Sequence, residues 1–386
     1  MQGGVLVEMP NENVNVLQTL IQFRRGTEEQ WNLVKDSYIP RAGEPCTTID
    51  GANAGQIKVG DGTHTWGELK YVGVGDLKVI KIYGDTTADT SVSVGDKTYA
   101  TIEEAIADAP AGTEVKLSGS LSDNTVNIDK ELTLDMNGVR AVNNEESLIT
   151  VGINGKLTLK NGELECNKNG VPNIEVNGET TLSDCTVVRT IEEKNNCFYA
   201  VLNHGKMIIN SGLFSAIGTD SSLVENGYYN YTSTNPIQGY VEGKNQPYPE
   251  LIVNGGTFVH DSDKSKLWLV KNDDGGKLTI NDGVFYGRVI NQGIEMVING
   301  GHFVSDSKMV IGVRKINDNL NLGKTIINGG VFEGNIEKVF EDYGAIAPDV
   351  QVKGGKFKVA VEEKYIASGY EQKLVNGWYV VSKKGE

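Results

Sequence analysis

The sequence predicts an all-β protein whose body is a parallel β-helix, a solenoid of stacked coils. Nine similar short segments recur, most of them 18 to 29 residues apart, with one gap of 44. Each alternates apolar residues before a turn that usually contains glycine, and six end in phenylalanine. Repeats at such intervals are typical of solenoids, in which every unit packs on its neighbours.

Each repeat predicts one strand, a tight turn and a return to the core. In the segment LTINDGVF, Leu278 and Ile280 share one face of a strand because side chains alternate along it. Asn281, Asp282 and Gly283 are expected in the turn, since Gly readily, and Asn and Asp moderately, adopt positive φ. The repeats lie at 132–138, 157–164, 181–187, 207–214, 251–258, 278–285, 296–303, 325–332 and 350–357.

The phenylalanines occupy one slot of the repeat, so we expect their rings to stack in a single interior column. Burying one such side chain contributes roughly 1.5–3 kcal/mol, which makes the column a large part of the predicted stability. The Leu-Asn consensus of leucine-rich repeats is absent, which favours the β-helix. The column comprises Phe214, Phe258, Phe285, Phe303, Phe332 and Phe357.

Composition excludes several classes of function. The chain has 386 residues and a formal net charge of −15, which argues against nonspecific nucleic-acid binding and against docking to an anionic membrane. No apolar run is long enough to span a membrane, and the first residues lack a secretory signal pattern. The four cysteines lack the close pairing of a zinc site, and we expect buried thiols, no metal and no cofactor. They are Cys46, Cys166, Cys185 and Cys197.

The first part of the chain predicts an extended arm over 1–21 and a small α+β module over 22–75. Thr27, followed by two acids and Gln30, is a capping signal that predicts a short helix at about 28–36. Two segments, 56–59 and 66–71, are separated by Gly60-Asp61-Gly62 and are expected to form a hairpin.

The succession FRRGT, QW, AGEP, GQIKVGDGTHTW and ELKYV within about 22–73 resembles a module at the N-termini of tailed-phage fibre and tropism-determinant proteins. The resemblance implies attachment to a virion, with Phe23, Arg24, Arg25 and Trp31 as candidate contacts. The alternative interpretation of the two arginines is an exposed or locally paired doublet without a binding role. The alternative for Trp31, as for Trp66, is that it belongs to a small hydrophobic core.

Residues 76–96 are predicted to be a linker, followed by a β-helix over 97–357 and a cap over 358–386. The stripe Ile102, Ala105, Ile106 and Ala109, stopped by Pro110, predicts a short helix that covers the first coil. Residues 97–138 resemble the opening of pectate-lyase-like right-handed β-helix proteins, which implies the same hand here. The terminal cap is expected to contain a helical turn at 362–368 and a hairpin around Asn376-Gly377.

The 44-residue gap holds either two coils or one coil with an excursion between about 216 and 249. The excursion is the best binding candidate, because long loops on a rigid scaffold often carry function and tyrosine suits stacking on sugars. The alternative is that its tyrosines pack the loop on the solenoid. They are Tyr228, Tyr229, Tyr231, Tyr240 and Tyr248.

Enzymatic chemistry is not expected. Glycoside hydrolases need paired carboxylates. Acid pairs are plentiful, such as Asp273 and Asp274, but we find none that recurs across coils in evident register with a basic partner. Solvated carboxylates are the preferred interpretation, and His302, on a spacer position, is expected to be exposed.

Together the sequence favours a virion structural protein, a head or tail fibre or a spike, assembled in the host cytoplasm. The resemblance implies a homotrimer anchored to capsid, tail or baseplate proteins through its N-terminus, with host-surface polysaccharide as a partner. A polysaccharide depolymerase tailspike and a bacterial surface adhesin are the alternatives. Neither nucleic acid nor a membrane is an expected partner.

Overall fold

The computed structural model describes residues 24–41, 44–48, 57–60, 62–69, 91–118, 121–122, 125–143, 145–166, 168, 170–189, 199–216, 222–228, 248–260, 268–315, 322–344 and 346–385. The chain divides into two compact units, Met1–Lys78 and Val79–Glu386, and each is described by itself. Among the described residues, no helix has the length and apolar character needed to cross a membrane.

The N-terminal unit contains a three-stranded sheet and one helix. Strands β1 (Arg24–Gly26) and β2 (Pro45–Thr48) are parallel, and β3 (Ile57–Val59) pairs antiparallel with β2. Helix α1 (Glu28–Val34) begins as predicted at a capping box. The Thr27 hydroxyl accepts a bond from the Gln30 N–H at 3.1 Å, and the Gln30 side chain accepts one from the Thr27 N–H at 2.9 Å.

The hairpin expected between 56–59 and 66–71 is wrong. Strand β3 pairs with β2 instead, and residues 66–68 form a turn. Two backbone N–H groups, of Glu68 and Leu69, donate to the Thr65 carbonyl, and the Thr65 hydroxyl and N–H both donate to the Glu68 carboxylate. These local bonds compete with strand pairing, so the chain turns where the apolar pattern predicted a strand.

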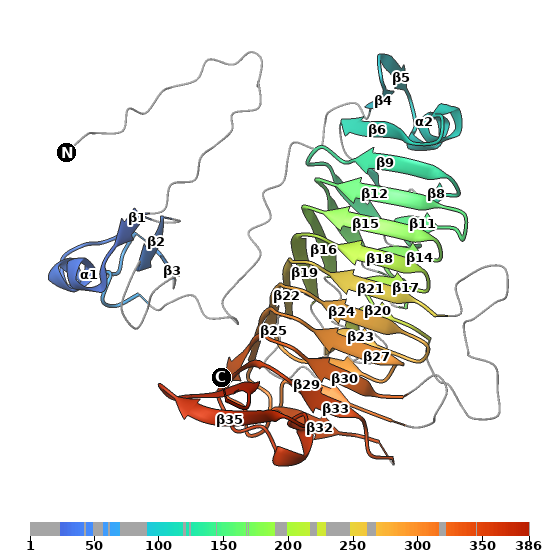
Figure 1. The fold of residues 1–386 in the computed structure, drawn as a ribbon. Coiled ribbons are helices and arrows are strands. Elements are labelled where there is room, and N and C mark those ends of the chain that lie inside the picture. The colour runs from blue at the N-terminus through green and yellow to red at the C-terminus, as the bar shows by residue number, and fades with distance from the viewer. Residues whose placement is uncertain are drawn as a thin grey trace. The chain divides into compact units, whose positions relative to one another are not determined.

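The second unit is a parallel β-solenoid, with three sheets running along its length (Figure 1). Each regular coil contributes one strand to each sheet, and consecutive coils pair in parallel register. The first sheet holds the apolar-x-apolar strand of the repeats. Its members, in order, are β5 (Lys97–Tyr99), β4 (Ser91–Val94), β6 (Thr113–Ser118), β9 (Glu131–Asp135), β12 (Lys156–Lys160), β15 (Glu179–Ser183), β18 (Lys206–Ile209), β21 (Glu250–Val253), β24 (Lys277–Ile280), β27 (Glu295–Ile298), β30 (Lys324–Ile327) and β33 (Val350–Val352).

The second sheet holds the strand that follows the glycine turn, with the phenylalanine slot at its centre. Its members are β7 (Leu121–Ser122), β10 (Arg140–Asn143), β13 (Glu163–Cys166), β16 (Cys185–Arg189), β19 (Gly212–Ala216), β22 (Thr257–His260), β25 (Val284–Tyr286), β28 (His302–Ser305), β31 (Val331–Gly334), β34 (Gly355–Phe357), β36 (Trp378–Lys383) and β35 (Tyr370–Val375).

The third sheet closes each coil before the chain returns to the first. Its members are β8 (Val126–Ile128), β11 (Ile149–Val151), β14 (Ile174–Val176), β17 (Val201–Asn203), β20 (Ser222–Asn226), β23 (Trp268–Asn272), β26 (Val289–Asn291), β29 (Ile311–Val313) and β32 (Phe340–Asp342).

The predicted phenylalanine column is confirmed. All six rings are fully buried, and successive centroids along the stack lie 4.5–4.8 Å apart. Their planes differ by only 5–11°. Parallel pairing places Phe258 beside Phe285 and Phe285 beside Phe303, so the register of the second sheet dictates the stack.

The 44-residue gap is a single coil. Strand β18 pairs directly with β21, and β19 with β22, so no further coil separates them. Strand β20 lies within the span expected for the excursion, and residues 229–247 lie outside the described part of the chain. The structure thereby decides between the two readings that the spacing left open.

A file of polar side chains also lies inside the solenoid, where the strands of the third sheet end. Asn203, Asn226, Asn272 and Asn291 are fully buried, and each donates its side-chain amide to the next oxygen at 2.7–3.0 Å, the last to Thr325 Oγ1. The same amides donate to main-chain carbonyls of the following coil, such as that of Lys277 at 3.0 Å. A satisfied ladder removes the cost of burying these amides.

Both ends of the solenoid carry additional elements. Helix α2 (Ile102–Asp108) packs on β4, β5, β6 and β8 and buries Ile102 and Ala105, as its stripe predicts. At the other end, the 3₁₀ helix η2 (Glu363–Tyr365) precedes the predicted hairpin of β35 and β36, which turns at Asn376 and Gly377 with φ of 50° and 79°. The linker boundary needs correction, because β4 already pairs with β6 before residue 97.

Candidate functional site

At the turn between the first and second sheets, asparagines of successive coils form a hydrogen-bonded ladder on the surface. Each side-chain amide donates to the Asn oxygen of the preceding coil at 2.8–3.0 Å, and the first member, Asn210, donates to Ser183 Oγ at 3.3 Å. None of these asparagines has positive φ. The expectation that Asn281 serves the turn through positive φ is therefore wrong, and it contributes a hydrogen bond instead. The ladder comprises Asn210, Asn254, Asn281, Asn299 and Asn328.

Glycine is needed at this turn for two separate reasons. Gly301 has φ of 100°, and a Cβ there would lie 3.3 Å from the Phe303 ring. A Cβ on its neighbour Gly300 would lie only 2.5 Å from the carbonyl oxygen of Asn281 in the preceding coil. The next coil repeats this at Gly329, 2.5 Å from the oxygen of Asn299. The stacked turns therefore present bare backbone.

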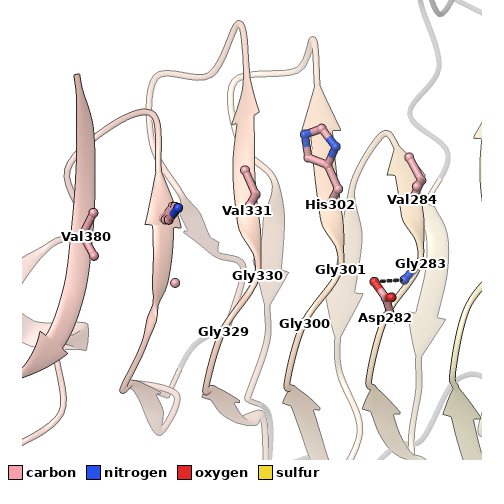
Figure 2. Close-up of a pocket in the computed structure, with 12 residues that line it drawn as sticks. Asp282, Gly283, Val284, Gly300, Gly301, His302, Gly329, Gly330, Val331 and Val380 are labelled. Carbon is pink, nitrogen blue, oxygen red and sulfur yellow. Dashed lines mark hydrogen bonds between the residues drawn. The ribbon is translucent and has the colours of Figure 1, made fainter. Parts of the chain in front are cut away.

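This backbone forms the floor of an open groove of about 550 Å³, which Figure 2 shows. Side chains at the spacer position of the second sheet stand beside the glycines, and Val380 of the terminal hairpin closes one end. The Asp282 carboxylate accepts a bond from the Gly283 N–H at 2.8 Å. The spacer residues that line the groove are Val284, His302, Val331 and Lys356.

His302 lies at the middle of the groove. The residue is half-buried rather than fully exposed as expected, with 43 % of its side chain exposed, and its Nε2 lies 2.6 Å from the Glu333 carboxylate. Among the described residues, no group of three or more His, Cys, Asp or Glu side chains is placed to hold a metal ion. The groove therefore presents backbone together with the side chains of Asp282, His302 and Lys356 and of its valines. The expectation that the protein does not cleave polysaccharide stays a prediction, and an assay of new reducing ends on host polysaccharide tests it.

The structure separates the tyrosines that were expected to bind. Tyr228 is fully buried, stacks on His204 with centroids 4.6 Å apart and donates its backbone N–H to the Asp274 carbonyl. It therefore packs the start of the excursion on the solenoid, and its assignment as a binding residue is wrong. Tyr248 is 52 % exposed. Tyr229, Tyr231 and Tyr240 lie outside the described residues.

The stacked pair predicts an acid sensitivity. Burial lowers the pKa of His204 from 6.5 to about 4. A group whose folded pKa is depressed contributes stability above its unfolded pKa, and this is lost as pH falls through the folded value. We expect stability to fall by on the order of 2–3 kcal/mol between pH 6.5 and 4 through this residue. Unfolding of His204→Gln should show a correspondingly flatter pH dependence, and an unchanged profile would contradict this.

A buried ionic cluster was missed by sequence reasoning. Glu225 of β20 pairs in register with Lys271 of β23. The Lys271 ammonium lies 3.1 Å from the Glu225 carboxylate and also forms an ion pair with Asp273. The Ser222 hydroxyl donates to Glu225 as well. The carboxylates are 1 % and 7 % exposed. Acids with a basic partner in register do therefore exist here, contrary to expectation, and only the single-coil reading of the long gap reveals the pairing.

The cluster has perturbed proton affinities. Burial raises the pKa of Glu225 well above its ordinary value, and Lys271 opposes this. The pKa of Lys271 is itself raised: burial lowers it, but the Glu225 and Asp273 charges outweigh burial. The Lys271 ammonium is hydrogen-bonded to both Glu225 and Asp273, so one lysine links the two buried acids within the sheet.

The candidate attachment residues have different positions. Trp31 is buried, its ring stacks on Trp66 with centroids 4.1 Å apart, and its Nε1 donates to the Thr47 carbonyl at 3.0 Å. It is a core residue, so its assignment as an attachment contact is wrong. Arg24 and Arg25 belong to β1, but their side chains, like the whole of Phe23, lie outside the described residues.

Three of the four cysteines are buried free thiols, as predicted. Cys46 lies in the N-terminal core, and Cys166 and Cys185 lie in the second sheet. Burial raises the pKa of Cys185 to about 11, which keeps the thiol protonated and unreactive at neutral pH. Cys197 is outside the described residues.

These features define a protein with a small N-terminal α+β unit and a parallel β-solenoid body. Residues 21–64 match the family model described as major tropism determinant N-terminal domain. The chain therefore carries a tropism-determinant type of domain, which indicates a phage-associated, fibre-type protein. No curated protein and no solved structure matches the chain.

Proposed function

We propose that this chain is a virion structural protein, a fibre or spike that the N-terminal unit anchors to the particle and that extends its solenoid outward. The observation that carries the proposal is the tropism-determinant domain at residues 21–64, joined in one chain to a solenoid with additional elements at both ends. A parallel solenoid stacked on a phenylalanine column is stiff, which suits a part that reaches toward a cell surface.

The proposed partners follow from this role. Capsid, tail or baseplate proteins hold the N-terminal unit, three copies associate, and host-surface polysaccharide contacts the solenoid. The groove over the glycine turns supports the last point, because several successive coils present the same backbone and a polymer with repeating units can follow them (Figure 2).

Deletion of residues 1–75 tests the anchoring role. We expect the shortened chain to lose incorporation into particles almost completely while it keeps the circular dichroism and protease resistance of a folded solenoid. Incorporation is measured by immunoblotting purified particles made with tagged full-length or shortened chains. Undiminished incorporation of the shortened chain would contradict the assignment of the N-terminal unit.

A further inference from the structure

A pocket on the outer face of the third sheet is independent of the groove already described. Its volume is about 500 Å³, and it spans four strands, β23, β26, β29 and β32, near the C-terminal end of the solenoid. Most of the side chains that line the pocket belong to residues at or next to the ends of these strands, in successive coils. The lining residues are Trp268, Arg288, Ile290, Gln292, Arg314 and Tyr343.

Aromatic side chains form one wall. In the outward row of the sheet, Ile290 is followed by Gly312, and a Cβ on Gly312 would lie 2.6 Å from the Trp268 indole. The indole therefore lies against the gap that this glycine leaves. Tyr343 meets it edge to face, with centroids 5.9 Å apart, and is itself 43 % exposed. The tyrosine ring is thus held by the tryptophan and open to solvent.

Two guanidinium groups enter the same pocket. Arg288 lies over the Trp268 ring, 4.2 Å from its centroid, which fixes the cation in place. Arg314 is exposed and donates to the side-chain oxygen of Gln292 at 3.0 Å. Two positioned cations in one pocket are notable in a chain of net charge −15.

One described acid, Glu341, lies near enough for its charge to act on Arg288. Glu341 follows Gly312 in the outward row. Its carboxylate accepts a bond from the Tyr343 hydroxyl at 2.9 Å and forms an ion pair with Lys338 at 3.3 Å. The pocket thus combines an exposed aromatic face, two guanidinium groups and an amide.

We propose that this pocket binds a sugar residue that carries a carboxylate, such as a uronic acid within an acidic polysaccharide. The apolar face of the sugar packs on Tyr343, and its carboxylate accepts hydrogen bonds from the exposed Arg314, since planar guanidinium groups match carboxylates. That the polysaccharide comes from a host surface rests on the proposed function, whereas the chemistry of the pocket does not.

Calorimetry on the purified full-length chain tests this proposal. The probes are tetrasaccharides bearing glucuronate, galacturonate or sialate, each paired with its carboxyl-reduced neutral form. We expect at least one acidic probe to bind roughly ten-fold or more tightly than its reduced form, and raised salt to weaken it. Arg314→Gln and Tyr343→Ala should each weaken that probe by roughly ten-fold or more. Both positions are exposed, and circular dichroism checks that the variants are folded.

Two matched controls are available away from the pocket. Lys116→Gln removes one exposed positive charge in β6, and Leu374→Ala truncates a side chain of β35 that is 65 % exposed. Both should bind like the wild type. The proposal is overturned if no acidic probe binds at millimolar concentration, if reduced forms bind equally well, or if the pocket variants bind as well as the controls.

The result separates cleanly from the test of the proposed function. Saccharide binding by a chain that never associates with particles would remove the virion role and leave the site. Particle association without saccharide binding would remove the site and leave the virion role.

Discussion

Phe303→Ala is expected to destabilise the solenoid by about 3–5 kcal/mol, the range for truncating a large buried aromatic side chain. The Phe303 ring is fully buried, with neighbouring centroids at 4.5 Å (Phe285) and 4.8 Å (Phe332), so its removal leaves a cavity and ends two stacking contacts. Guanidinium unfolding measures the loss. Hydrogen exchange should show the largest increase in β25, β28 and β31, which flank the cavity.

Two further variants make the test specific to the column. Phe303→Leu retains most of the buried volume, so its cost should be well below that of alanine. Leu374→Ala removes a side chain that is 65 % exposed and should change stability by no more than about 0.5 kcal/mol. A cost for Phe303→Ala near that of the exposed control would show that the column does not support the fold.

Lys271→Met is expected to cost about 3–5 kcal/mol at pH 8, because it leaves Glu225 and Asp273 buried beside each other without their shared cation. Loss of the lysine also removes the charge that lowers the pKa of Glu225, which burial already raises. The control is Lys277→Met on β24, an exposed lysine whose replacement should change stability by no more than about 0.5 kcal/mol.

The same variant should show a defined pH dependence. A carboxyl group whose folded pKa is raised contributes stability below its unfolded pKa, and this is lost as pH rises through the folded value. The deficit of Lys271→Met relative to wild type should therefore shrink as pH falls from 8 toward the ordinary glutamate range near 4.5. Urea unfolding of both proteins across this interval measures it. A deficit that is equal at both ends would mean that lost packing, rather than buried charge, causes the effect.

Much of the first and second sheets could be predicted because their signals are local. Alternation at Leu278 and Ile280 places two side chains on one face, and Phe285 follows the turn at a fixed distance. The hairpin at Asn376-Gly377 and the cap at Thr27 are likewise dictated by residues within a few positions of one another. Local geometry of this kind depends on neighbouring residues in the sequence and not on where the segment lies in the fold.

Local signals did not predict the third sheet, the groove over the glycine turns or the pocket that contains Tyr343. Four strands of the third sheet end in Val-x-Asn, but no glycine turn marks them, and insertions of different length separate the strands of this sheet from the repeats. Hence the register that pairs Glu225 with Lys271, and the approach of Trp268 to Gly312, depend on where each coil closes. Tyr228 shows the same limit, because its burial against His204 depends on a neighbouring coil.

The sequence by itself determined the solenoid, its interior phenylalanine file, the helix that packs on the first coil and the tropism-determinant resemblance of the first residues. Only the tertiary structure decided that the long gap is one coil, that Trp31 and Tyr228 are core residues, and that arginines from separate coils share a pocket with Tyr343. The physical reason is that short-range periodicity sets which side chains face inward, whereas stacking of whole coils sets which outward side chains become neighbours.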